Sequence, residues 1–161
     1  MSWLALVRGI GLFLLLVVLH YTVRPLLGMR VTADFLVIAV LVTAVQVRPG
    51  VAAVIGLLTG VISDSLTPLS FGAGALALST VGFSASWLKA AVFGDNVLLQ
   101  AIFIAAGKWA FDVLYLVAER RLSFAELAVQ LAFWSPLSGL ATGLAGLVVV
   151  ALFRRSAERT R

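Results

Sequence analysis

The sequence predicts an all-α integral membrane protein, folded as a compact bundle of six transmembrane helices. The first observation is composition: 62% of the 161 residues are hydrophobic, and the mean hydropathy is +1.13. Soluble domains contain roughly 45–50% apolar residues. The second observation is that only a few residues separate one apolar segment from the next. Because a bilayer core is about 30 Å thick and takes about 20 apolar residues per helix, we expect one polytopic membrane domain over residues 1–161.

Composition also excludes several kinds of site. The chain has no cysteine and one histidine, His20, so disulfides, thiolate sites and histidine-rich metal sites are excluded. We expect neither a metal nor a cofactor. The net charge of +5 does not indicate nucleic-acid binding, because the basic residues lie at expected helix ends, where membrane topology places them.

Breaks rich in proline, glycine and charge set the bounds of the expected spans. Residues 48–50 (Arg-Pro-Gly) form a tight turn, which makes the second and third spans an antiparallel hairpin. Residues 122–130 predict a short interfacial helix, with Ser123 and Glu126 at capping-box spacing. If both termini are cytoplasmic, the cytoplasmic segments carry more Lys and Arg residues than the outer segments do. Because basic residues favour the cytoplasmic side, this orientation is the expected one. The expected spans are residues 9–23, 33–47, 51–66, 71–93, 97–118 and 131–153.

Lys108 and Asp112 are the most unusual residues of the fifth span. They lie near its middle, four residues apart, so that their side chains share one helical face. A charge at mid-bilayer costs about 2.5–3.5 kcal/mol on insertion scales. We therefore expect an intramembrane polar pair; a structural ion pair, a contact to a partner helix and a transport site all remain open.

Small residues form stripes on two of the expected spans. Gly56 and Gly60 are followed by Asp64 at the same spacing, and Gly139 and Gly143 form a similar stripe on the sixth span. Such stripes let membrane helices approach closely, so we expect these residues in helix packing or partner binding. Asp64 is expected to hydrogen-bond backbone groups at the following break or at the start of the fourth span.

Asp34 opens the second span, where a carboxylate suits the positive end of the helix dipole, and we interpret it as a helix cap. No catalytic residue is expected. The sequence has no phosphate-cradling loop, no acidic metal cluster and no histidine placed to serve a serine nucleophile. These features favour a non-enzymatic protein.

The middle of the chain resembles the rod shape-determining protein MreD family. The resemblance covers about residues 30–95 and includes an aspartate that opens the second helix, although Ala33 replaces the proline expected before Asp34. The motif residues are 33–36 (ADFL), 47–50 (VRPG), 55–64 (IGLLTGVISD) and 69–72 (LSFG).

The resemblance implies a non-enzymatic scaffold of the bacterial cell-elongation complex in the inner (plasma) membrane. Its expected direct partner is the transmembrane helix of MreC. MreB, RodA and a class B penicillin-binding protein are expected indirect partners, and the complex controls cell shape and peptidoglycan synthesis. The family is also similar in fold to the substrate-binding S-components of energy-coupling-factor vitamin transporters, which leaves that function as an alternative. The first helix lacks the alanines four apart through which S-components dock their energy module, and this favours the scaffold.

Overall fold

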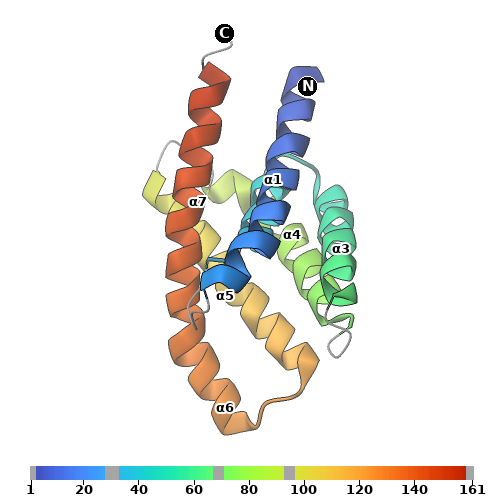
Figure 1. Ribbon diagram of the computed structural model, residues 1–161, viewed down its shortest axis with the longest axis vertical. Coiled ribbons are helices and arrows are strands. Elements are labelled where there is room, and N and C mark those ends of the chain that lie inside the picture. The colour runs from blue at the N-terminus through green and yellow to red at the C-terminus, as the bar shows by residue number, and fades with distance from the viewer. Residues whose placement is uncertain (1–2, 28–32, 67–70, 93–96, 159–161) are drawn as a thin grey trace.

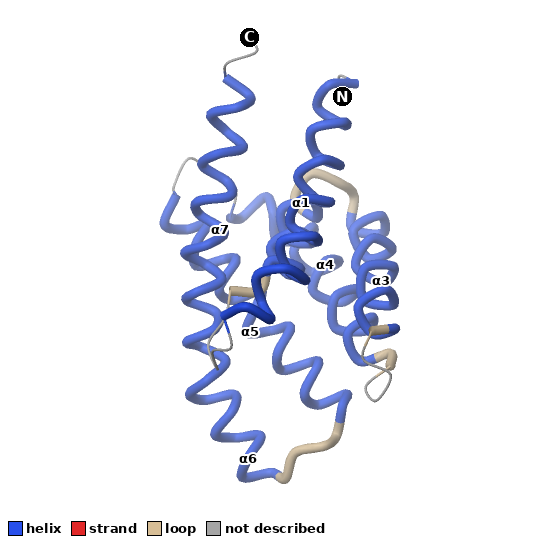
Figure 2. Tube along the Cα trace, viewed as in Figure 1, coloured by secondary structure: helices blue, strands red, loops and turns tan. Residues whose placement is uncertain are grey.

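The structure is a computed structural model that describes residues 3–27, 33–66, 71–92 and 97–158. Within these ranges every regular element is a helix, which confirms the expected all-α class (Figure 2). The two ends of the chain lie at the same end of the bundle (Figure 1). The helices are α1 (Trp3–Leu27), α2 (Phe35–Ala44), α3 (Pro49–Ser65), α4 (Ala73–Val92), α5 (Val97–Glu119), α6 (Phe124–Val129) and α7 (Ser135–Glu158).

Helix α2 is the centre of the fold. It packs against α1, α3, α4, α5 and α7, and Val37, Ile38 and Val40 are at most 1% exposed. A helix that is apolar on all sides is typical of a core position. Its 10 residues extend only about 15 Å, so the expected second span over residues 33–47 was too long. The chain leaves the helix at Val45 and turns. After the turn the Val47 carbonyl accepts from Ser86 Oγ and Lys89 Nζ of α4 at 2.7 and 2.8 Å.

Helices α3 and α4 form a closely packed pair. Pro49 occupies the first turn of α3, where its missing N–H costs nothing. A Cβ atom on Gly56 would collide with the backbone of Leu78, and one on Gly60 would collide with the backbone of Ala75. Glycine is therefore required at both positions for the close approach of these two helices.

Helix α1 is longer than the expected span over residues 9–23. It continues through Pro25 and ends at Leu27. A proline removes one helical hydrogen bond and usually ends or kinks a helix. Here the proline lies in the last turn, so few residues of the helix follow it.

Helix α6 continues into α7 through a π-helical turn at Gln130–Trp134. The predicted capping box is confirmed: Ser123 Oγ accepts from the Glu126 N–H, and Glu126 Oε2 accepts from the Ser123 N–H. Pro136 has no N–H to donate to the Leu131 carbonyl five residues earlier, and Trp109 Nε1 of α5 donates to that oxygen at 3.1 Å. The wider turn therefore has a local cause, since π-turns and prolines both interrupt the usual ladder.

The surface of the bundle is strongly apolar, and polar side chains lie inside. Two helical stretches, Leu98–Glu119 and Phe124–Ala151, are long and apolar enough to cross a membrane by length and composition. Among the exposed apolar side chains, Leu140 and Leu144 are 63% and 66% exposed. The buried polar or charged residues are His20, Asp34, Thr59, Asp64, Ser86, Gln100, Lys108, Ser135 and Thr142.

Candidate functional site

Asp34 caps α2 inside the bundle. Its Oδ1 accepts from the Val37 N–H at 3.3 Å, so the predicted helix cap is confirmed. Its own N–H donates to Thr142 Oγ1 of α7 at 3.1 Å. Because α2 is short and central, this capped end lies in the interior, and only 7% of Asp34 is exposed. The carboxylate that caps α2 is therefore also a buried charged group.

Lys108 connects that charge to α5. Its Nζ donates to Asp34 Oδ2 at 3.0 Å and to Asp112 Oδ1 at 2.6 Å. It also lies 4.8 Å from the centroid of the Phe111 ring. The predicted Lys108–Asp112 contact is present, and Asp34 is a second carboxylate that the sequence analysis did not assign to it. We call these three residues the Asp34–Lys108–Asp112 triad.

His20 of α1 completes the surroundings of Asp34. Its Nδ1 lies 3.4 Å from the Leu36 nitrogen and 3.3 Å from Asp34 Oδ1. The same nitrogen either accepts from the Leu36 N–H or carries a proton and donates to the carboxylate, but it does not do both at once. In both arrangements His20 fastens α1 to the start of α2. Its ring also packs edge-on against Tyr21, with centroids 5.1 Å apart.

Asp64, near the end of α3, caps the start of α4. Its Oδ2 accepts from the N–H groups of Gly72 and Ala75 at 2.8 and 3.0 Å, and Oδ1 accepts from the Gly74 N–H at 3.2 Å. A carboxylate at a helix N-terminus is stabilised by the unpaired N–H groups and by the dipole. Gly72 has a φ of +97°, a conformation that suits glycine. The expected contact of Asp64 with the start of the fourth helix is confirmed.

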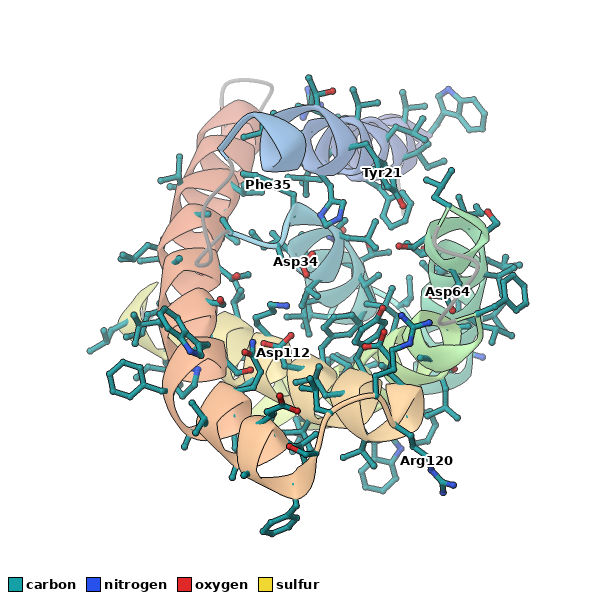
Figure 3. All side chains as sticks on the ribbon, turned by 60° about the horizontal axis from the view of Figure 1, so that its bottom comes forward. Tyr21, Asp34, Phe35, Asp64, Asp112 and Arg120 are labelled. Atoms are coloured by element: carbon teal, nitrogen blue, oxygen red, sulfur yellow. The ribbon has the colours of Figure 1, made fainter. Side chains whose placement is uncertain are left out.

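A polar cavity of about 310 Å³ lies among these residues. Asp34, Asp64 and Asp112 come from different elements and surround the middle of the bundle when the end that carries α6 faces the viewer (Figure 3). Aromatic side chains of α5, Phe111 and Tyr115, form part of its wall. Its polar lining includes His20, Asp34, Asp64, Lys108, Asp112 and Gln130.

A second hollow, the apolar groove, follows α5 and α7 on the outside of the bundle. Its volume is about 600 Å³. Ala106, Trp109 and Leu140 are among its lining residues, and every residue that lines it is apolar or glycine. Gly143, one residue of the predicted small-residue stripes, also lines it.

The remaining residues of these stripes lie in contacts between helices of the chain itself. Gly56 and Gly60 face α4, as described above. A Cβ on Gly139 would lie 3.0 Å from the Ala105 carbonyl oxygen, and one on Gly143 would lie 2.9 Å from the Ala101 oxygen. Helix packing is therefore the observed role of these four residues, and the α3–α4 seam is not open to a partner.

Charge and hydrogen bonding decide what the polar cavity can do. The described residues contain no group of three His, Cys, Asp or Glu side chains placed to hold a metal ion. One buried hydroxyl, Tyr21 OH, has no hydrogen-bond partner within the described ranges. The arrangement is suited to holding a charged or hydrogen-bonding group away from water, since buried polar atoms need partners.

Comparisons with known proteins identify no relative. No family model matches the chain, no curated protein matches it, and no solved structure matches it.

Proposed function

We propose that this chain is a non-enzymatic membrane scaffold of the MreD type, which binds the transmembrane helix of MreC in the bacterial inner membrane. The observation that carries the proposal is the apolar groove between α5 and α7. The resemblance of residues 30–95 to the MreD family supplies the identity of the partner, and through MreC the scaffold contributes to cell shape and peptidoglycan synthesis.

The distribution of polarity supports a multi-pass membrane protein. Charged groups such as Asp34 and Lys108 lie inside and are paired, whereas large apolar side chains such as Leu14 and Leu144 are more than half exposed. Soluble monomers rarely expose contiguous apolar patches beyond a few hundred Å². Charged residues within membrane helices face the bundle interior and pair with one another. The observed arrangement therefore fits a lipid solvent.

The dimensions and chemistry of the groove support a helical occupant. It extends from Leu98 to Trp109 on α5 and from Pro136 to Leu147 on α7, about 17 Å of each helix. Its lining includes Ala101, Ala105 and Gly143, and small residues allow close approach of a further helix in a bilayer. A single apolar helix matches this shape better than a soluble ligand does.

The test is co-purification of MreC with the tagged full chain after co-expression and extraction in a mild detergent. The double variant Leu140→Ser and Leu144→Ser makes the groove polar without reaching the core. Leu14→Ser with Leu15→Ser is the matched control, because these α1 residues are similarly exposed, at 56% and 61%. We expect the groove variant to lose MreC and the control to retain it. Retention of MreC by both variants would contradict the proposal.

A second candidate function, a substrate-binding S-component of a vitamin transporter, is favoured by the polar cavity. Such a protein needs an enclosed site with charged groups, and the Asp34–Lys108–Asp112 triad lies beside a cavity of about 310 Å³. The same purification distinguishes the two functions. An ATPase module or a bound vitamin-like molecule would replace MreC in the purified material.

A further inference from the structure

We propose that the polar cavity binds a small organic cation through an alkylammonium group, held beside the carboxylates of Asp34 and Asp112. The inference does not rest on the scaffold function, because the cavity is lined by α5 residues from Lys108 to Leu116 and the apolar groove by α5 residues from Leu98 to Trp109. Binding of MreC and binding of a cation are therefore separate measurements, and either can fail alone.

The first argument is charge. Among the described residues that line the cavity, three carry carboxylates, Asp34, Asp64 and Asp112, and only Lys108 carries an ammonium group. Asp64 is stabilised by three backbone N–H groups at the start of α4. The triad itself places two carboxyl groups around one ammonium group. Buried charges are stabilised by opposite charges, so the cavity favours a cation.

The second argument is size. The cavity of about 310 Å³ corresponds to about ten water molecules at about 30 Å³ each. A bare inorganic ion would leave most of that space to water, whereas an amine with a carbon chain occupies a larger part of it. The volume therefore favours an organic cation over a metal ion.

The third argument is the aromatic wall. The rings of Phe111 and Tyr115 are stacked with centroids 5.6 Å apart, and both line the cavity. Phe111 already has the Lys108 ammonium 4.8 Å from its centroid. Aromatic faces attract ammonium groups and also contact alkyl carbons. The wall thus suits both parts of an alkylammonium ion.

Two sources share this chemistry: a free amine and the ammonium headgroup of a zwitterionic lipid such as phosphatidylethanolamine. The probe for both is butylammonium chloride, titrated calorimetrically into the purified full chain in neutral detergent. Butan-1-ol and sodium chloride are the matched ligands, because the first lacks the charge and the second lacks the carbon chain. We expect saturable binding of butylammonium and no saturable binding of the other two.

Variants locate the site. Asp112→Asn removes one carboxylate from the cavity wall and is expected to weaken butylammonium binding by about tenfold, the size of one charge-assisted hydrogen bond. Glu126→Gln removes an equal charge from the exposed surface of α6 and should leave binding unchanged. Tyr115→Leu should weaken butylammonium binding without creating binding of sodium.

The wild-type comparison stands even where a variant fails to fold. Equal binding of butylammonium and butan-1-ol, binding of sodium alone, or no saturable binding of any probe would overturn the proposal. Mass spectrometry of lipids that co-purify with the chain then separates the sources. If butylammonium releases bound phosphatidylethanolamine, the natural ligand is a lipid headgroup. If butylammonium binds only to protein that carries no lipid, the natural ligand is a free amine.

Discussion

Two stretches of α5 belong to different environments. The α5 residues that line the polar cavity lie between Lys108 and Leu116, and those that line the apolar groove lie between Leu98 and Trp109. The cavity stretch is closed by Asp34 from the centre of the fold. The groove stretch is left open by α7, which packs closely through Gly139 and Gly143 but does not cover it.

This difference assigns fold stability to the residues of the cavity and partner binding to the residues of the groove. The residues of the cavity hold each other in place, so a change there disturbs the fold. The exposed residues of the groove contribute little to the isolated chain, so a change there should affect mainly a partner. The predictions below test this separation, from the largest expected effect on stability to the smallest.

Removal of the central cation should have the largest effect. Lys108→Met leaves Asp34 and Asp112 buried without their ammonium partner, which should lower the free energy of unfolding by about 3–5 kcal/mol. Thermal unfolding in detergent, followed by circular dichroism, measures the change.

A triple variant serves as the control for this prediction. Lys108→Met combined with Asp34→Asn and Asp112→Asn contains no unpaired charge in the triad, so much of the lost stability should return. If Lys108→Met alone is as stable as the wild type, the triad does not contribute to the stability of the fold.

The α3–α4 seam should respond next. Gly60→Leu introduces side-chain atoms against the backbone of Ala75, and we expect a loss of about 1–3 kcal/mol, as for other overpacked interiors. Gly11→Ala is the control, because a Cβ at Gly11 meets nothing within 4 Å. Its unfolding temperature should be no lower than that of the wild type, because alanine favours the helix more than glycine does. Loss of MreC by Gly60→Leu with an unchanged unfolding temperature would make this seam, rather than the groove, the partner site.

The hydrogen bond at the π-turn should contribute less. Trp109→Phe keeps most of the aromatic area but removes the Nε1–H that donates to the Leu131 carbonyl at 3.1 Å. We expect a loss of about 1 kcal/mol, the net value of one such bond. Hydrogen exchange of the amides around Gln130–Trp134 should increase locally. Unchanged exchange there would mean that the turn is held by other contacts.

The groove variant should have the smallest effect on the isolated chain. Leu140→Ser with Leu144→Ser alters exposed side chains only, and surface changes of this kind are usually within about 0.5 kcal/mol each. The unfolding temperature without MreC should therefore stay close to the wild type. A large drop would show that the groove is part of the core and would remove the contrast between the groove and the cavity.

Local patterns in the sequence were sufficient for much of the fold. The break at residues 48–50 predicted a third span from residue 51, and α3 begins two residues earlier, at Pro49. The capping box of Ser123 and Glu126 predicted the start of α6. Lys108 and Asp112 could be paired because four residues on a helix bring side chains together. Each of these predictions depends on neighbours in the chain.

Long-range contacts were not accessible in the same way. Asp34 and Lys108 are 74 positions apart, and Asp34 and Thr142 are 108 apart. A helix cap explained Asp34 fully at the local level, so nothing required a second role. The available signal was the cost of a carboxylate next to the apolar run of α2, which calls for a cation elsewhere. The short length of α2 was hidden because the apolar residues Val45 and Val47 continue the apolar run beyond the end of the helix.

The 74-residue separation of Asp34 and Lys108 has a consequence for biosynthesis. A ribosome that has just made α2 has produced the acid of the pair, and α3, α4 and half of α5 must follow before the base exists. The seam between α3 and α4 connects segments adjacent in the chain and is available early. We therefore expect the α3–α4 pair to form first during synthesis. The Asp34–Lys108 pair at the centre of the bundle can form only after the second half of the chain has been made.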